Sequence, residues 1–285
     1  MSSDSSYYVP ESSKLPIFMA FGLLLFVLGA GSTINDLGKE NSNSYILLMT
    51  SFAVIWGVMF VWFSNVINEN NKGMYSDQLN QSFVWGMAWF IFSEVMFFFA
   101  FFLALGYVRM FSVPWLGGEG EKAIANILWP AFEATWPVMV TPDNENFPGA
   151  EHNMNMPGIT KLHTWLPFWN TLCLVTSSGT IALAEAALKK GKRAAFKSWM
   201  VVTISLGFIF VFLQGLEYYE AYAHMGLTLG AGIYGTTFFL LTGFHGFHVC
   251  LGAIILTIMT IRGFGGAFSE HDHFGLAAGS WYWHF

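Results

Sequence analysis

The sequence contains few charged residues. Asp, Glu, Lys and Arg make up only 11% of its 285 residues, whereas ordinary soluble domains carry about 25%. Hydrophobic residues make up 54% and aromatic residues 18%. A soluble fold of this size needs more polar surface than this sequence supplies, so the composition indicates an integral membrane protein. The net charge is −6, and we find no basic tract typical of nucleic-acid binding.

Cysteines and catalytic groupings are also scarce. Cys173 and Cys250 are the two cysteines, and both fall in apolar stretches, where they are best interpreted as packed small residues. No Ser/His/Asp or Cys/His grouping indicates nucleophilic catalysis. The glycines at 226–232 lack the Lys and the strand–helix context of a phosphate-binding loop. The residues therefore do not predict a stand-alone catalyst.

Long apolar segments dominate the chain. A bilayer core needs roughly 20 apolar residues per helix, and the sequence predicts a seven-transmembrane-helix bundle that is all-α and forms a single membrane domain. Residues 1–14 form a polar tail, and residues 108–161 form an extramembrane loop that holds six of the nine prolines. The seventh helix, beginning near Phe274, is incomplete because its apolar run of eleven residues is too short to span a bilayer. Helices 1–2 are predicted at 15–34 and 45–67. Helices 3–7 occupy 83–285 and are predicted at 83–107, 162–188, 195–219, 233–261 and 274–285.

Positive charges on the connections predict the orientation. The tail and the loops after the second, fourth and sixth helices carry eight lysines and arginines, and the opposite loops carry four. The run KKGKR at 189–193 contributes most of this difference. We therefore expect the N-terminus to face the cytoplasm or the mitochondrial matrix. Three tryptophans in the long loop suit a segment at the membrane interface, namely Trp115, Trp129 and Trp136.

Glu94 is a carboxylate in the middle of a membrane segment. It is the twelfth residue of the segment 83–107 and lies about 16 Å from its start at about 1.5 Å per residue. A charged form would be poorly solvated there, and an Asp at a helix centre costs about 2.5–3.5 kcal/mol on insertion scales. Two interpretations stay open: a functional carboxylate, or a protonated one that only bonds a neighbouring helix. Its neighbours on the helix face are Phe90, Ile91, Phe97 and Phe98.

Other polar residues also lie in apolar segments. His245 and His248 share a helix face at a spacing that metal ligands use, but a zinc or haem site needs more deep ligands. We therefore favour hydrogen bonding between helices for both. Glu217 and Tyr218, in LQGLEYYEA, lie at the outer end of the fifth helix and are interpreted as solvated or inter-helix polar contacts.

Four segments together resemble one family. They are FSEVMFFFAFF in the third helix, LQGLEYYEA in the fifth, YGTTFFLLTGFHGFHVCLGAIIL in the sixth and HFGLAAGSWYWHF at the entry to the seventh. In this order they resemble subunit III of haem–copper cytochrome c oxidase, over roughly residues 10–110 and 160–285. The family's relatives continue the seventh helix through a further apolar run.

The resemblance implies an accessory, non-redox core subunit of a terminal respiratory oxidase, which reduces O₂ to water and pumps protons. It implies a V-shaped cleft between helices 1–2 and helices 3–7 that holds phospholipids. It places haem and copper in partner subunits I and II, leaving this chain without a metal, a cofactor or a catalytic residue of its own. The chain would flank subunit I, support its proton uptake and stabilise it.

The resemblance also assigns roles to residues. Glu94 matches the family's carbodiimide-reactive carboxylate, and Arg262, seventeen residues after His245, matches a lipid-phosphate-binding arginine. Trp62 is a further lipid-binding residue by the same resemblance. The chain also departs from the family. Ser64 and Asn68 stand where relatives place arginines, and Ala184 and Glu185 lie at the helix end where many relatives have paired histidines. Ala277 stands where some relatives have an acidic residue.

The long loop bears on the source, and other functions remain as alternatives. The loop is longer than in mitochondrial relatives, which favours a multi-pass protein of a bacterial inner membrane. Subunit III of a related quinol oxidase commonly lacks the first two helices, and the present pair argues against it. A proton- or ion-conducting membrane protein built around Glu94 would need several mid-membrane polar groups or an inverted repeat, and we find none. A haem-bearing redox enzyme would need more deep histidines.

Overall fold

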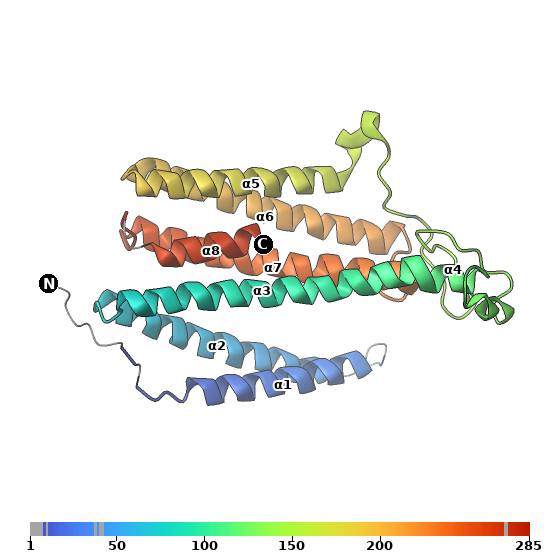
Figure 1. The fold of residues 1–285 in the computed structure, drawn as a ribbon, viewed down its shortest axis with the longest axis horizontal. Coiled ribbons are helices and arrows are strands. Elements are labelled where there is room, and N and C mark those ends of the chain that lie inside the picture. The colour runs from blue at the N-terminus through green and yellow to red at the C-terminus, as the bar shows by residue number, and fades with distance from the viewer. Residues whose placement is uncertain (1–7, 10, 37–38, 40–42, 271–272) are drawn as a thin grey trace. The chain divides into compact units, whose positions relative to one another are not determined.

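The computed structural model describes residues 8–9, 11–36, 39, 43–270 and 273–285 (Figure 1). These residues form helices and no strands, which confirms the all-α class. Six helical stretches are long and apolar enough to cross a membrane, one of them running from α3 through α4 as Asp77–Leu116, and the shorter α8 follows them. The α-helices are α1 (Leu15–Asn35), α2 (Ser44–Asn71), α3 (Asp77–Tyr107), α4 (Val113–Leu116), α5 (Leu166–Lys189), α6 (Arg193–His224), α7 (Gly232–Phe264) and α8 (Phe274–His284).

Several helices extend beyond the apolar runs that predicted them. α3 begins six residues before the expected start at 83, because Ser76 Oγ accepts a hydrogen bond from the Leu79 backbone N–H at 3.3 Å and caps a polar first turn. α2 continues to Asn71 and α6 to His224, past the expected ends at 67 and 219. Hydropathy marks the part of a helix that suits lipid, and the helices continue into their polar flanks.

The segment expected as a loop at 108–161 is partly helical. After Tyr107 the chain passes through a π-helix, η1 (Val108–Ser112), and then α4. Pro114 lies in the first turn of α4, directly after the π-helix. Two 3₁₀ helices follow in this part of the chain, η2 (Ala123–Ile127) and η3 (Ile159–Thr164).

The chain forms two compact units, Met1–Gly86 and Met87–Phe285. In the first unit α1 and α2 form a helical hairpin that packs closely at Gly29, where an added Cβ would lie 2.7 Å from the Leu48 backbone nitrogen. Small residues permit this approach, which is a common basis of helix association in membranes. The rings of Phe26 and Phe52 pack edge to face beside it, with centroids 5.4 Å apart.

In the second unit α5 and α6 form a hairpin against which α7 and α8 pack (Figure 1). Trp283 of α8 fixes this arrangement. Its indole N–H donates to Ser177 Oγ of α5 at 2.9 Å, and its ring packs where Gly207 of α6 and Gly252 of α7 leave room. One buried core of this unit consists of Ile181, Ala184, Ala187, Leu188, Phe196, Met200, Leu256, Phe268 and Leu276.

The segment between α4 and α5 packs onto the C-terminal end of α6 and the N-terminal end of α7. One core joins Val113, Phe132 and Val138 to Ile233 of α7. The Glu151 backbone N–H also donates to the Met225 carbonyl at 3.0 Å. The segment is thus packed against the end of α6 and the start of α7, with defined contacts at both.

Candidate functional site

The site is built on Glu94 of α3 and His248 of α7. Glu94 Oε2 lies 2.8 Å from His248 Nε2, although 154 positions separate the two residues. Glu94 is near the middle of α3, and His248 is near the middle of α7. The structure therefore brings together the mid-membrane carboxylate and one of the two histidines that the sequence singled out separately.

The second ring nitrogen of His248 determines how protons are distributed in this pair. Nδ1 lies 2.6 Å from the Phe244 carbonyl oxygen, which can only accept, so Nδ1 carries a hydrogen. In a neutral imidazole Nε2 is then an acceptor, and Glu94 must be protonated to donate to it. In an imidazolium both nitrogens donate, and Glu94 is a carboxylate. Both arrangements hold one proton between Glu94 and His248, and the pair is neutral overall in each.

Aromatic rings surround the pair. The Phe98 ring centroid lies 5.4 Å from that of His248, and the rings of Tyr282 and Phe285 lie 6.1 Å from it. The side chain of His248 is 15% exposed and that of Glu94 is 24% exposed. Glu94 is part of α3, and none of the residues in the most apolar 18-residue stretch of this helix is buried.

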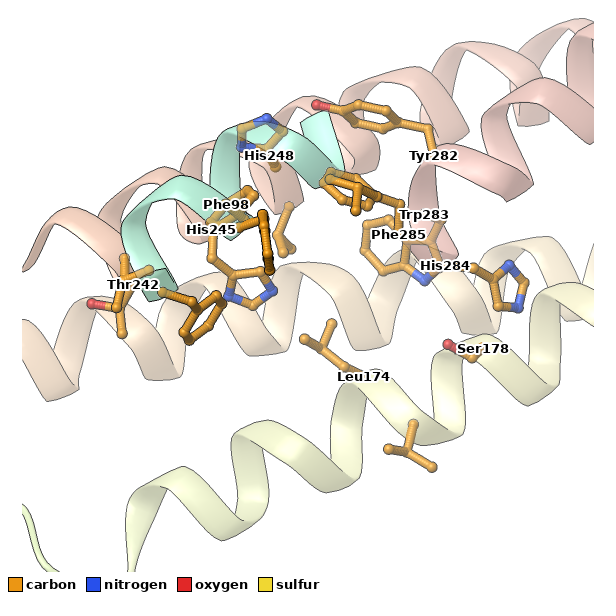
Figure 2. Close-up of a pocket in the computed structure, with 16 residues that line it drawn as sticks. Phe98, Leu174, Ser178, Thr242, His245, His248, Tyr282, Trp283, His284 and Phe285 are labelled. Carbon is orange, nitrogen blue, oxygen red and sulfur yellow. The ribbon is translucent and has the colours of Figure 1, made fainter. Parts of the chain in front are cut away.

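His245 has different neighbours from His248. Its ring packs edge to face on Phe210 of α6, with centroids 5.6 Å apart. In Figure 2 the imidazoles of His245 and His248 point in different directions from α7. Both line a cavity of about 680 Å³ between α3, α5, α7 and α8, to whose wall Phe285 also contributes. The two histidines therefore do not converge on one point, as ligands of a shared metal would.

Glu217 and Tyr218 each contact a neighbouring helix. Glu217 is 7% exposed, and its Oε2 accepts a hydrogen bond from Asn170 Nδ2 of α5 at 2.9 Å. The hydroxyls of Tyr218 and Thr242 of α7 lie 2.7 Å apart. These two interactions link α6 to α5 on one side and to α7 on the other. Asn170 and Thr242 could not be recognised from the sequence, because a single polar residue in an apolar helix gives no sign of its partner.

The two residues assigned to lipid lie in different units. Arg262 is in the last turn of α7, where its guanidinium packs over the Phe268 ring at 5.3 Å and its Nη1 lies 3.9 Å from Met259 Sδ. Lys197 is near the same end of α7, with its Nζ 3.4 Å from the Phe264 carbonyl oxygen. Trp62 lies on α2 and is exposed. Among the residues that the structure describes, no group of three His, Cys, Asp or Glu side chains could hold a metal ion.

The fold and the site define a multi-pass helical membrane protein with an ionisable pair inside the bundle. The family model of cytochrome c oxidase subunit III matches residues 5–121 and 127–285. Proteins named cytochrome c oxidase subunit 3 align over 282 residues, covering 98% of this chain and 91% of each relative, with 32% identity for Arabidopsis thaliana and Triticum aestivum and 31% for Oncorhynchus masou. The chain belongs to the cytochrome c oxidase subunit III family and is a subunit of a proton-pumping oxidoreductase complex.

Proposed function

We propose that this chain supports proton uptake by the catalytic subunit of the oxidase through Glu94 and His248, without carrying a redox centre itself. The observation that supports this is the 2.8 Å contact between a carboxylate and an imidazole whose other nitrogen is already a donor. The pair holds one proton, which can reside on either residue, so it can accept and release a proton at a fixed position in the membrane.

The partners in this proposal are subunits I and II, which carry the haems and copper. Glu94→Gln keeps the size and hydrogen-bonding capacity of the side chain but removes its titration. Electron transfer and oxygen reduction are therefore expected to continue in the assembled variant, while proton release per oxygen falls in part or the enzyme loses activity sooner during turnover. Oxygen consumption, proton release and lifetime of the wild-type and Glu94→Gln complexes test this.

The outcomes of this experiment are separable. Complete loss of oxygen reduction in a fully assembled, haem-replete variant would place the chemistry in this chain and contradict the accessory role. Wild-type proton release together with a wild-type lifetime would mean that the pair only joins α3 to α7. A hydrophobic carbodiimide should modify Glu94 in preference to the other acidic residues, because such reagents attack a protonated carboxyl in an apolar environment, and Glu94→Gln should abolish that labelling.

A second part of the proposal concerns phospholipid. Arg262 and Lys197 place two cations at one end of α7, and Arg262 is the better partner for a phosphodiester because a guanidinium donates two parallel hydrogen bonds. Trp62 is proposed to contact lipid from α2. By the distribution of loop charges, the end of α7 and the N-terminus face the cytoplasm of a bacterium.

Arg262→Ala tests the lipid contact. Loss of a charge-assisted hydrogen bond of about 1.5–3 kcal/mol should lower the occupancy of anionic phospholipid in native mass spectra of the complex. Lys189→Ala, at the exposed C-terminal residue of α5, is the matched control and should leave occupancy unchanged. Equal occupancy in wild type and Arg262→Ala would mean that the arginine does not hold the lipid.

A further inference from the structure

The Glu94–His248 pair uses only one of the two carboxyl oxygens of Glu94. Oε2 lies 2.8 Å from His248 Nε2, whereas Oε1 has no hydrogen-bond partner among the residues that the structure describes. When the proton resides on His248, the pair is ionic, and an ion pair in an apolar environment is stable only if further hydrogen bonds satisfy its remaining lone pairs. The acyl chains of lipids cannot donate such a bond. The ionic arrangement therefore needs one more donor at Oε1.

Tyr282 of α8 lies against both sides of the pair. It is 5% exposed, and its ring centroid lies 6.1 Å from that of His248. On the other side its ring stacks on Phe90, with the centroids also 6.1 Å apart, and Phe90 is one turn before Glu94 on α3. In Figure 2 the hydroxyl end of Tyr282 is directed towards His248. The Tyr282 side chain is thus placed between α3 and α7 at the level of the pair.

The end of α8 is held in place, so the position of Tyr282 is defined. The indole N–H of the next residue, Trp283, donates to Ser177 Oγ of α5 at 2.9 Å. The ring centroid of Phe285 lies 6.1 Å from that of His248. Tyr282 also lines the cavity described above, which leaves room for its hydroxyl to adjust.

The Tyr282 hydroxyl is available as this donor. Within the described part of the chain it forms no hydrogen bond, and Tyr282 interacts electrostatically with Glu94. The hydroxyl next to Glu94 on α3, that of Ser93, already donates to the Phe90 carbonyl at 2.6 Å. The imidazole of His245 points in a different direction from the pair and packs on α6. A bond from Tyr282 would therefore complete the site without breaking another.

We propose that Tyr282 is a positioning residue of the pair, and that its hydroxyl donates a hydrogen bond to Oε1 of Glu94 when the proton resides on His248. In that transfer the Oε2–H bond of Glu94 breaks and the Nε2–H bond of His248 forms, while Tyr282 keeps its own proton and the net charge is unchanged. The additional hydrogen bond stabilises the ionic arrangement, so both arrangements are populated. This inference rests on the proposed function, because a pair that exchanges a proton at a fixed position must populate both.

Infrared spectroscopy of the assembled, resting complex tests the proposal, because a protonated carboxyl and a carboxylate absorb at different frequencies. The difference between wild type and Glu94→Gln assigns the bands of Glu94. Tyr282→Phe keeps the ring but removes the donor, so the ratio of carboxylate to protonated Glu94 should fall about tenfold, as expected for the loss of one hydrogen bond to a charged group. Tyr218→Phe removes a hydroxyl that contacts α7 elsewhere in the unit, and as the control it should leave the ratio unchanged. The haem content of each purified complex verifies assembly.

Two further variants separate the hydrogen bond from a change in packing. 3-Fluorotyrosine at position 282 is nearly the same size as tyrosine but has a more acidic hydroxyl, so it should shift the ratio the other way, towards the carboxylate. In a His248→Phe background no imidazolium can form, so Tyr282→Phe should then leave the bands of Glu94 unchanged. An equal ratio in wild type and Tyr282→Phe, or the same shift in the His248→Phe background, would overturn the proposal. Either result would leave the proton-uptake role intact, since that role is tested by proton release in Glu94→Gln.

Discussion

Glu94 and Glu217 are two carboxylates in one helical unit, and the difference between them lies in their partners. Glu94 faces an imidazole at 2.8 Å, and Glu217 faces an amide at 2.9 Å. An imidazole can take up a proton, whereas an amide cannot at physiological pH. The distances are nearly equal, so geometry alone does not separate the roles. The chemistry of the partner makes one pair suitable for proton exchange and the other for holding α5 to α6.

The largest effect on stability is expected at Glu217. Glu217→Leu leaves the amide of Asn170, which is 5% exposed, without its acceptor and should cost about 1–3 kcal/mol. Glu217→Gln can still accept from Asn170 and should remain close to wild type. Thermal dissociation of this chain from the complex measures both variants. If Glu217→Leu were as stable as wild type, the Glu217–Asn170 bond would contribute nothing to the packing of α5 on α6.

A smaller effect, specific to proton release, is expected at the other pair. His248→Phe keeps a ring beside Phe98 but removes the proton acceptor, so it should reproduce the deficit of Glu94→Gln. The double variant should be no worse than the more affected single variant, because residues that act as one unit are not additive. Proton release per oxygen in the four complexes gives the coupling, and Glu217→Gln serves as the control. Additive deficits would mean that Glu94 and His248 act separately.

The sequence predicted the positions of the helices but not their ends or their partners. The depth of Glu94 follows from counting residues along an apolar run, and α3 places it near its middle. Its bond to His248 could not be predicted, because the sequence showed only that His248 shared a face with His245. In the packed helices His248 contacts Glu94 of α3, whereas His245 packs on Phe210 of α6.

The segment 108–161 was the least predictable part. Its six prolines indicated a loop, yet Pro114 lies in the first turn of α4, directly after the π-helix. The 3₁₀ helix η2 has no hydrophobic period that would indicate a buried face, and Asn126 is bonded through its side chain to two carbonyls that precede and follow it. Bonds of this kind depend on the path of the whole segment and leave no local pattern in the sequence.

The smallest expected effect extends the comparison to a third carboxylate, Glu69, whose partner is the hydroxyl of Tyr75 between α2 and α3. The hydroxyl lies 2.9 Å from Glu69 Oε2 and 3.0 Å from the Val66 carbonyl oxygen, and both are acceptors. Burial, followed by the hydrogen bond to Glu69 and the charge of its carboxylate, raises the pKa of Tyr75 well above its usual value of about 10. Here the partner of the carboxylate is a weak acid that keeps its proton.

The sign of the pH dependence follows from this direction. As pH rises past about 10, Tyr75 in an unfolded chain loses its proton while the folded form retains it, so the stabilisation present below that pH is lost as pH rises towards the folded pKa. Tyr75→Phe removes this dependence and should cost about 1 kcal/mol at neutral pH through the loss of the hydrogen bond that the hydroxyl donates. The difference in tyrosinate absorbance between wild type and Tyr75→Phe isolates the titration of this one residue. A difference curve centred near the usual tyrosine pKa would mean that Glu69 and Tyr75 are not bonded, and the comparison would then rest on Glu94 and Glu217 alone.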